Sequence, residues 1–309
     1  SNNPSYVIGV NANVNGTGSA SANFLFTKSI FRMGVCVTPK NIFPSNIQGL
    51  PTWYEVRVSE KGYLGRRENI DLVVAMNPQS FIKDMASVRE GGYFFYDSSK
   101  KIHEEQMRKD IQYIGIPITE ICNATYTDPR QRQLFKNIIY VGALSALLNI
   151  EFNVLEDLLS DQFKGKEKLI PLNVRALQIG VNYVHQHFSY PLEICVERRN
   201  LIGDRIMIDG NTACGLGAIY GGATVAAWYP ITPSTSVVEA FMDYSDEFRT
   251  DEVTKKRNVA IVQAEDELAA IGMVIGANWN GARSFTATSG PGLSLMNEFL
   301  GLAYFAEVP

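Results

Sequence analysis

Residues 229–235 read YPITPST, and the two prolines exclude this stretch from the interior of a helix, because each fixes φ and removes a backbone donor. An apolar run at residues 224–229 predicts a strand before it, and residues 236–248 predict a helix after it. We therefore expect a rigid, extended corner that holds three hydroxyl groups in fixed positions. Such a corner suits the orientation of a polar ligand.

Two more junctions of a strand with a helix follow along the chain. Residues 259–264 predict a strand and residues 267–278 a helix, with the motif EDELAA at residues 265–270 between them. A further predicted strand, residues 283–288, ends at the motif SGPG, residues 289–292. Open α/β sheets carry their ligand-binding loops at the carboxyl ends of strands, so we expect the three loops to converge on one crevice.

The N-terminal half also alternates strands with helices. Strands are predicted at residues 6–10, 70–75 and 93–96, and a helix at residues 22–33 that stops at Gly34. Three more helices are predicted at residues 133–148, 154–162 and 171–187. The alternation predicts an α/β fold with a mostly parallel sheet.

A domain boundary is predicted where residues 189–209 mix proline, glycine and charge and interrupt the periodic pattern. We therefore expect domains at residues 1–188 and 210–309, joined by this linker. The second domain opens with a run of small residues, 210–218, whose glycines predict a closely packed helix. Residues 41–53 are too apolar for an ordinary surface loop, and they form either an interface or an edge hairpin of the first domain.

Composition narrows the class of protein. The chain has 309 residues, 46% of them hydrophobic, which is enough for two cores. Its 28 basic and 32 acidic residues are well mixed, which disfavours nucleic acid as a partner. No apolar run approaches the roughly 20 residues of a membrane-spanning helix, and the polar start lacks the regions of a signal peptide. We expect no membrane partner and a cytoplasmic location.

Cysteines and histidines give little evidence of a metal site. The four cysteines form no CxxC pair, which disfavours a disulfide framework or an iron–sulfur site within the chain. His185 and His187 share a face only if they lie on a strand, and we interpret them as the solvated end of a helix. We assign no metal ligand to this chain.

The YPITPST and EDELAA motifs, with their spacing to TSGPGLSLM at residues 288–296, resemble the α subunit of 2-oxoacid:ferredoxin oxidoreductases. The 2-oxoglutarate branch looks closest. NGTGSA at residues 15–20 and the run at residues 41–60 look like the γ domain that one branch fuses in front of the α domain. Family α subunits continue past the equivalent of Pro309, and the apolar helical pattern at residues 293–305 lacks a returning strand, so we expect a C-terminal truncation.

The resemblance implies that residues 210–309 form a partial pyrimidine-binding domain for thiamine diphosphate. It implies two catalytic residues: Glu267, hydrogen-bonded to N1′ of the aminopyrimidine, and Thr232, beside the thiazolium and the substrate carboxylate. Ser234 and Thr235 are then expected to cap the following helix. The implied cofactor-binding residues are Tyr229, Pro230, Ile231, Thr232, Glu267, Ser289, Gly290 and Pro291.

Other interpretations remain open at two of these motifs. The acidic residues 265–267 also suit a charged first turn that complements the helix dipole, and we assign Glu265 and Asp266 to that role. The glycines of SGPG allow positive φ and a close approach of the backbone to another group, which suits a loop that lies against a flat ring. A plain turn fits the same residues.

A glycine loop near the N-terminus raises the question of anion binding. Glycines after a strand free backbone N–H groups to meet an anion at a helix N-terminus. The resemblance allows a coenzyme A phosphate at this loop, whereas a tight structural turn is the alternative, since no complete GxGxxG is present. The candidate residues are Gly16, Thr17 and Gly18.

The sequence contains no GDG followed by an asparagine-containing metal loop. The resemblance therefore implies that a β subunit supplies Mg²⁺, the diphosphate site and a [4Fe-4S] cluster, in a heterodimer or a dimer of heterodimers. The implied reaction is decarboxylation of a 2-oxoacid, 2-oxoglutarate first, to acyl-CoA and CO2 with electrons passed to ferredoxin, or the reverse carboxylation. The alternatives are a pyruvate-specific member, a catalytically silent assembly subunit, and a relative of transketolase or acetolactate synthase.

Overall fold

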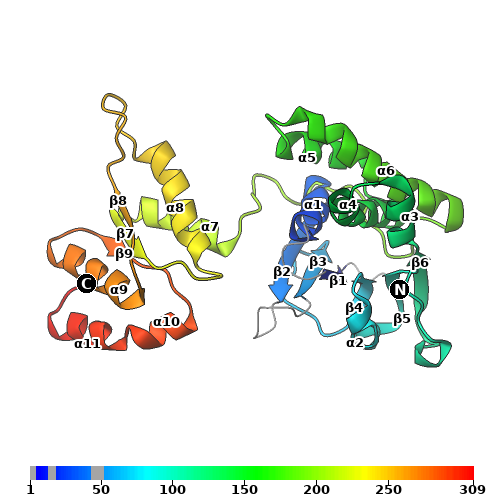
Figure 1. The fold of residues 1–309 in the computed structure, drawn as a ribbon, viewed down its shortest axis with the longest axis horizontal. Helices are drawn as coiled ribbons and strands as arrows, with labels where there is room; N and C mark the ends of the chain where they lie inside the picture. Colours follow the sequence, from blue (N-terminus) through cyan, green and yellow to red (C-terminus); the bar gives the residue numbers. More distant parts are fainter. Residues whose placement is uncertain (1–4, 13–18, 43–51) are drawn as a thin grey trace. The chain divides into compact units, whose positions relative to one another are not determined.

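The computed structural model describes residues 5–12, 19–42 and 52–309 (Figure 1). The chain divides into two compact units, Ser1–Ile206 and Met207–Pro309. Each unit is built of helices on a β-sheet, which confirms the predicted α/β class. None of the helices in the described ranges is both long enough and apolar enough to span a membrane.

The first unit contains a six-stranded sheet in the order β2-β3-β1-β4-β5-β6. The pairs β1–β4, β4–β5 and β5–β6 are parallel, whereas β3 is antiparallel to both β1 and β2. The hairpin β2–β3 thus forms one edge of the sheet, as the edge-hairpin interpretation predicts; residues 43–51 lie outside the described ranges. The strands are β1 (Ser5–Ala12), β2 (Cys36–Ile42), β3 (Thr52–Ser59), β4 (Ile70–Ala75), β5 (Val88–Asp97) and β6 (Gln112–Ile116).

Helices cover both faces of this sheet. The central strand β4 is buried along its whole length: Leu72 joins the larger core with α1, α4, α5 and α6, and Val73 joins a smaller one with α2. Consecutive strand residues point to opposite faces, so an apolar strand between two helical layers serves both cores. The helices are α1 (Ser19–Arg32), α2 (Phe81–Ser87), α3 (Ile118–Thr125), α4 (Pro129–Leu147), α5 (Phe152–Gln162) and α6 (Ile170–His187), with 3-10 turns at Pro78–Ser80, Glu104–Gln106 and Glu167–Leu169.

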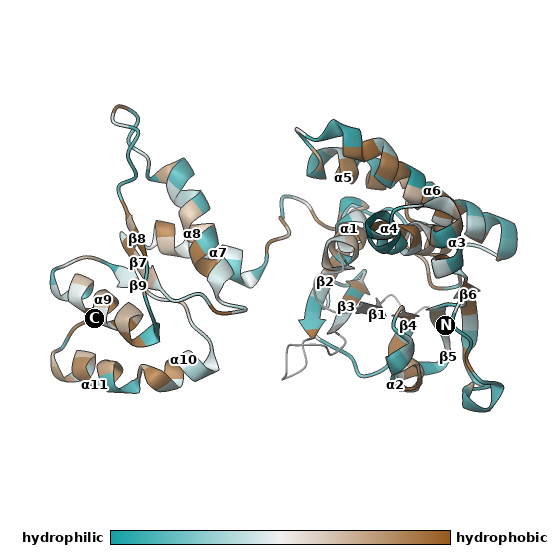
Figure 2. Cartoon of the chain, in the orientation of Figure 1, coloured by the Kyte–Doolittle hydropathy of each residue, from teal (hydrophilic) through white to brown (hydrophobic). Residues whose placement is uncertain are grey.

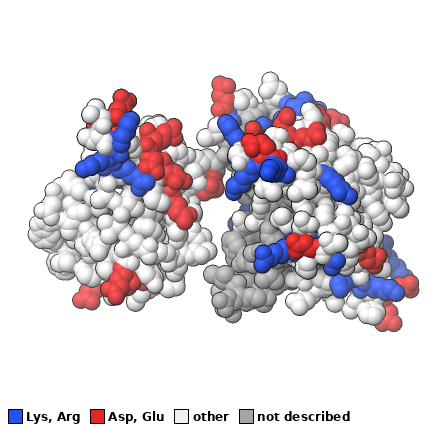
Figure 3. Space-filling model, turned by 45° about the horizontal axis from the view of Figure 1, so that its top comes forward, with Lys and Arg blue, Asp and Glu red and all other residues white. Residues whose placement is uncertain are grey.

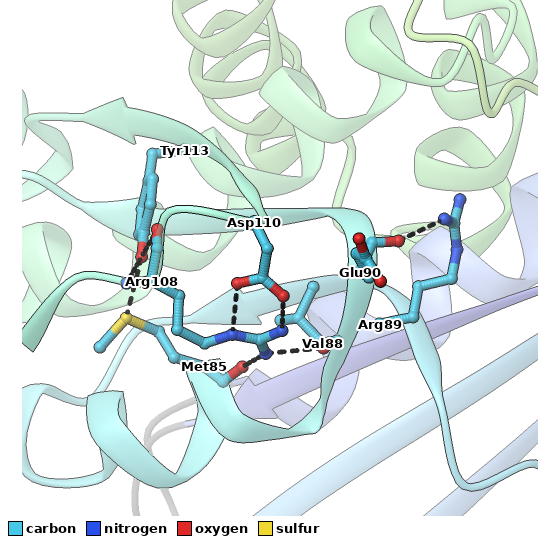
Figure 4. Close-up of polar contacts among 7 residues, drawn as sticks. All are labelled: Met85, Val88, Arg89, Glu90, Arg108, Asp110 and Tyr113. Carbon is cyan, nitrogen blue, oxygen red and sulfur yellow. Dashed lines mark hydrogen bonds and ion pairs between the residues drawn. The ribbon is translucent and has the colours of Figure 1, made fainter.

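Hydrogen bonds from Arg108 join the connection between β5 and β6 to the end of α2 (Figure 4). Its Nη1 donates to the carbonyl oxygens of Met85 at 2.7 Å and Val88 at 2.8 Å. The guanidinium also bonds the Asp110 carboxylate, and the backbone N–H of Arg108 donates to the Tyr113 hydroxyl at 2.8 Å. A positive charge at the carboxyl end of a helix satisfies terminal carbonyls and complements the dipole.

Residues 189–209 contain no regular helix or strand, and their first part is bonded to the first unit. The backbone N–H of Leu192 donates to Leu147 at 2.8 Å, and that of Val196 to Leu148 at 2.8 Å. Arg199 continues the pattern with a 2.9 Å bond to the carbonyl of Met33. Residues 192–199 therefore lie along α1 and the end of α4.

The second unit has a three-stranded parallel sheet in the order β8-β7-β9. On β7, Ala226 packs in a cluster with α7 and α8, and its neighbour Ala227 packs in a cluster with α9 and Met296, so helices cover both faces. The elements are α7 (Gly210–Tyr220), β7 (Val225–Trp228), α8 (Thr235–Phe248), β8 (Ala260–Gln263), α9 (Glu267–Trp279), β9 (Ser284–Phe285), α10 (Gly290–Leu295) and α11 (Asn297–Phe305).

Gly215 and Gly217, two glycines of the small-residue run at residues 210–218, have different surroundings. A Cβ on Gly215 would lie 2.8 Å from Ala240 Cβ and 2.9 Å from the Val237 carbonyl, so α7 packs closely on α8 as predicted. A Cβ on Gly217 would meet nothing within 4 Å. Close packing therefore explains Gly215 but not Gly217.

Two predicted elements of the second unit differ from the structure. The strand expected at residues 283–288 has only two residues, because only Val225 and Ala226 of β7 pair with it. The single helix expected at residues 293–305 is broken at Met296, which is 2% exposed and caps α10 by donating its N–H to two carbonyls. The side chain of Met296 joins the buried cluster with Ile271 and Val274 of α9 at this break.

The helices α10 and α11 carry exposed apolar side chains, and Figure 2 colours segments of both helices brown for hydrophobic residues. Tyr304 and Phe305 are 80% and 85% exposed. In Figure 3 charged side chains gather in several places, where acidic and basic residues lie close to one another. The other large apolar residues exposed on these helices are Leu293, Leu295, Leu300 and Leu302.

Candidate functional site

Three loops of the second unit leave the same edge of its sheet. Because β7, β8 and β9 are parallel, their carboxyl ends at Trp228, Gln263 and Phe285 lie together. The N–H of Ala264 donates to the carbonyl of Trp228 at 2.8 Å and joins the first two loops at their origin. The sequence motifs thus follow three neighbouring strand ends, where α/β sheets bind ligands.

The corner after β7 is a closed turn. The N–H groups of Ser234 and Thr235 both donate to the carbonyl of Ile231, at 2.9 and 3.1 Å. The expectation of an extended corner is therefore wrong for residues 232–234, because this carbonyl draws the chain back on itself. Tyr229 and Pro230 precede the turn without regular structure, and both are exposed.

Two of the three hydroxyl groups of this corner form hydrogen bonds within the turn, and the third is exposed. Ser234 occupies the N-cap of α8 with helical φ of −79°, and its hydroxyl donates to the Ile231 carbonyl at 3.1 Å. The Thr235 hydroxyl accepts from the Ile231 N–H at 2.9 Å. The expected capping role is thus wrong for both, since capping by a side chain uses an extended N-cap residue. Thr232 is exposed, and its hydroxyl has no partner within the described chain.

Asn211, which the sequence interpretation missed, braces the corner from α7. Its side-chain amide donates to the Pro233 carbonyl at 2.9 Å and to the Ser236 hydroxyl at 2.8 Å. Asp209 caps α7 by accepting from the Thr212 N–H at 2.9 Å. An asparagine two residues after a capping aspartate was the available signal, but its target lies more than twenty residues away in sequence.

The acidic residues after β8 take different positions. Asp266 is the N-cap of α9, and its Oδ1 accepts from the Ala269 N–H at 2.7 Å, in line with the first-turn role predicted for it. Glu267 is the first residue of the helix and is half-buried, whereas Glu265 is exposed. Glu267 is thus the least solvated carboxylate of the three.

SGPG after β9 begins a helix instead of forming a loop. Ser289 is the N-cap of α10, and Gly290, Pro291 and Gly292 form its first turn. The positive φ that the glycines allow is not used at Gly290 or Gly292, because Pro291 suits the first turn of a helix. The use of Gly292 is close approach: a Cβ there would lie 2.1 Å from Thr288 Oγ1 and 2.9 Å from Glu267 Cγ.

Three buried polar atoms at this edge have no hydrogen-bond partner in the described chain. Trp228 Nε1 is at the carboxyl end of β7, and the hydroxyls of Thr286 and Thr288 follow β9. Buried polar groups are nearly always paired in folded proteins. Of the three, Thr288 lies beside Glu267 and Gly292, and all three lie at or after the carboxyl end of a strand, so this edge of the sheet offers donors to a bound ligand.

Other candidate positions lie elsewhere. Gly16, Thr17 and Gly18 are outside the described residues, and α1 begins immediately after them at Ser19. Pockets of about 510 and 350 Å³ are lined by residues 248–258 and by the outer surfaces of α1 and α5, respectively, and neither includes a predicted site residue. No three His, Cys, Asp or Glu side chains of the described ranges gather as a metal site.

Comparison with protein families assigns both halves of the chain. Residues 10–183 match the family model of pyruvate ferredoxin/flavodoxin oxidoreductase. Residues 216–309 match the model of the thiamine diphosphate-binding domain of pyruvate flavodoxin/ferredoxin oxidoreductase. The second match contains all three loops of the candidate site.

Individual relatives agree with these matches. The chain is 29% identical to 2-oxoacid:ferredoxin oxidoreductase 2, subunit alpha, of Aeropyrum pernix, over 95% of this chain and 52% of that protein. It is 47% identical to the 2-oxoglutarate synthase subunit KorA of Methanocaldococcus jannaschii over 33% of this chain and 25% of that one.

One solved structure is similar over almost the whole chain. It is the 2-oxoglutarate:ferredoxin oxidoreductase from Magnetococcus marinus with 2-oxoglutarate, coenzyme A and succinyl-CoA bound. The TM-score is 0.82 at 30% identity, over 99% of this chain and 51% of that chain. The chain thus spans about half the length of the first relatives it matches.

Proposed function

The chain belongs to the pyruvate ferredoxin/flavodoxin oxidoreductase family, and from this premise we propose that it is the α subunit of a 2-oxoacid:ferredoxin oxidoreductase. The proposed domains are a γ domain at residues 1–188, a linker at 189–209 and a pyrimidine-binding domain at 210–309. The proposed substrate is 2-oxoglutarate, converted with coenzyme A to an acyl-CoA and CO2 or formed in reverse. Relatives named for 2-oxoglutarate support this choice.

The contact between Glu267 and Gly292 carries the proposal. It places a half-buried carboxylate beside a helix turn that has no side chain at the point of contact. Unpaired buried donors border the same edge. A carboxylate, a bare backbone surface and free donors fit the aminopyrimidine of thiamine diphosphate, a flat ring with several polar atoms.

When bound, thiamine diphosphate supplies the electron sink that makes loss of CO2 from a 2-oxoacid possible. Glu267 would hold the aminopyrimidine by a hydrogen bond to N1′ and would supply a group that can exchange a proton there, which a glutamine cannot do. Ser289, Gly290 and Pro291 offer the ring a surface of backbone with little side-chain bulk.

The corner after β7 orients the substrate. Asn211 and Thr235 hold the turn through the bonds to Pro233 and Ile231, so Thr232 projects from a braced segment. Its exposed hydroxyl donates to the carboxylate of the 2-oxoacid. Tyr229, Pro230 and Ile231 line the approach to it.

Further protein completes the enzyme in this proposal. A β subunit holds Mg²⁺, the diphosphate and a [4Fe-4S] cluster, ferredoxin accepts the electrons, and the assembly is a heterodimer or a dimer of heterodimers. The exposed apolar surface of α10 and α11 supports an assembly, because such surfaces commonly mark interaction sites. The loop at Gly16, Thr17 and Gly18 is proposed to contact a coenzyme A phosphate.

The test is a pair of glutamine substitutions in the assembled complex. Glu267→Gln fills the same volume but cannot exchange the proton, so we expect turnover to fall by at least about a hundredfold, the usual scale of one general acid–base contribution. Glu265→Gln, at an exposed neighbour, is the matched control and keeps most activity. Full activity in Glu267→Gln would remove this residue from the site.

A further inference from the structure

Thr288 and Glu267 are neighbours across Gly292. Thr288 Oγ1 and Glu267 Cγ lie 2.1 and 2.9 Å from one point, the position that a Cβ on Gly292 would take. The two side chains come from segments that follow different strands, β9 and β8. Only the missing side chain at residue 292 allows them to share this space.

The Thr288 hydroxyl has no hydrogen-bond partner in the described chain, although it is buried. The carboxyl oxygens of Glu267 lie two bonds beyond Cγ, so rotation about the last two side-chain bonds can carry one of them toward the hydroxyl. The other nearby carboxylates do not compete, because Asp266 accepts from the Ala269 N–H and Glu265 is exposed.

We propose that Thr288 is a positioning residue, whose hydroxyl donates a hydrogen bond to the Glu267 carboxylate and fixes the rotamer in which that carboxylate meets its ligand. A hydrogen bond to a carboxylate is shorter and stronger than one between neutral groups. The rotamer of Glu267 that accepts this bond is therefore more stable than the rotamers without it. The identity of the ligand rests on the proposed function, but the bond itself does not require a ligand.

The first measurement uses the chain alone at one fixed pH. Glutamate carboxyl carbons are labelled with 13C, and Glu267→Gln identifies the resonance of Glu267. We expect Thr288→Val and Thr288→Ala to shift and broaden this resonance, because the carboxylate loses its donor and samples more rotamers. Thr288→Ser retains the hydroxyl and restores the parent signal.

Thr286→Val is the matched control, since it removes a second buried, unpaired hydroxyl from the same segment. It leaves the Glu267 resonance unchanged if the effect is specific to Thr288. A Glu267 resonance identical in the parent and in both Thr288→Val and Thr288→Ala overturns the proposal, as does an equal change in Thr286→Val.

The second measurement uses the assembled complex saturated with thiamine diphosphate. Thr288→Val is expected to lower kcat about tenfold with little change in the KM for the 2-oxoacid, and Thr288→Ser to recover most of it. A change in the resonance without any change in kcat overturns the positioning role. If Glu267→Gln is fully active while the resonance responds to Thr288, the proposed function fails and the hydrogen bond stands.

Discussion

Asp97 offers a quantitative test of how the first unit holds together. It lies at the carboxyl end of β5, is 1% exposed, and accepts hydrogen bonds from the N–H groups of Ser99 at 3.1 Å and Thr119 at 3.3 Å. Its second oxygen accepts from the Thr119 hydroxyl and pairs with Lys136 Nζ at 3.3 Å. One carboxylate thus joins β5 to the start of α3 through Thr119 and to α4 through Lys136.

Asp97→Ala is expected to destabilise the first unit by about 3 kcal/mol. Removing one partner from a buried ion pair costs roughly 3–5 kcal/mol, and the lower end applies because the Lys136 side chain is 18% exposed and water reaches part of it. Asp97→Asn keeps an acceptor for the backbone donors, so we expect about 1–2 kcal/mol, near the scale of one unsatisfied hydrogen bond.

The effect depends on pH with a definite sign. Burial acts to raise the pKa of Asp97, but the hydrogen bonds from Thr119 and the charge of Lys136 together lower the pKa below its ordinary value. A lowered pKa contributes stability above the ordinary value of about 4, and this contribution is lost as the pH falls through the folded-state pKa. The difference between the parent and Asp97→Ala is therefore largest near neutral pH and shrinks in acid.

The assay is urea unfolding followed by tryptophan fluorescence in a Trp228→Phe, Trp279→Phe background, where Trp53 reports on the first unit alone. Asp161→Ala is the control, because its pair with Arg32 is exposed and such pairs contribute at most about 1 kcal/mol. A loss below 1 kcal/mol in Asp97→Ala, or a loss that stays constant from pH 7 to pH 3, would refute the reasoning.

Three further predictions concern the second unit. Thr232→Val in the assembled complex is expected to lower kcat/KM for the 2-oxoacid by a factor that corresponds to about 1–3 kcal/mol, the scale of a lost polar partner. Cofactor binding should stay nearly intact, and unchanged kcat/KM would exclude Thr232 from the site. Gly292→Ala is expected to reduce turnover by at least about tenfold with the fold retained by circular dichroism, because the added methyl meets Thr288 and Glu267; parental turnover would show that Glu267 needs no such space. The chain alone is expected to bind thiamine diphosphate poorly, and tight Mg²⁺-dependent binding by calorimetry would contradict the need for a β subunit.

The periodic elements of this fold could be predicted from sequence. The strand at residues 70–75 and the helices near α5, α6, α8 and α9 came within about two residues of their observed bounds, because apolar periodicity and start signals are local. The short strand β6 and helices α2 and α3 were not predicted. Each has five to eight residues and is defined by what it packs against.

The site could be predicted as a set of loops but not as a set of contacts. Glu267 was assigned through the resemblance of the EDELAA motif to the family, and it is the first residue of α9 in the structure. Asn211 and Thr288 could not be identified, since their roles depend on Pro233 and Gly292 being brought to them by the fold. The closed turn at Ile231 was missed for a similar reason: a single carbonyl accepting two backbone donors leaves no signal in residue type.

Both units contain buried polar groups that the fold pairs and others that it leaves unpaired, since Tyr126 Oη of the first unit also has no partner in the described chain. Under α1, Tyr140 donates to Asn23 Oδ1 at 2.6 Å and Thr27 bonds the Tyr54 hydroxyl at 3.0 Å, so this interior network is satisfied within one unit. The unpaired atoms of Trp228, Thr286 and Thr288 lie instead at the carboxyl edge of a sheet. An interior group without a partner only costs stability, whereas one at a ligand-binding edge gains its partner on binding. In the proposed function, a polar ring bound at this edge would give these donors their partners and would lie against the Glu267–Gly292 contact.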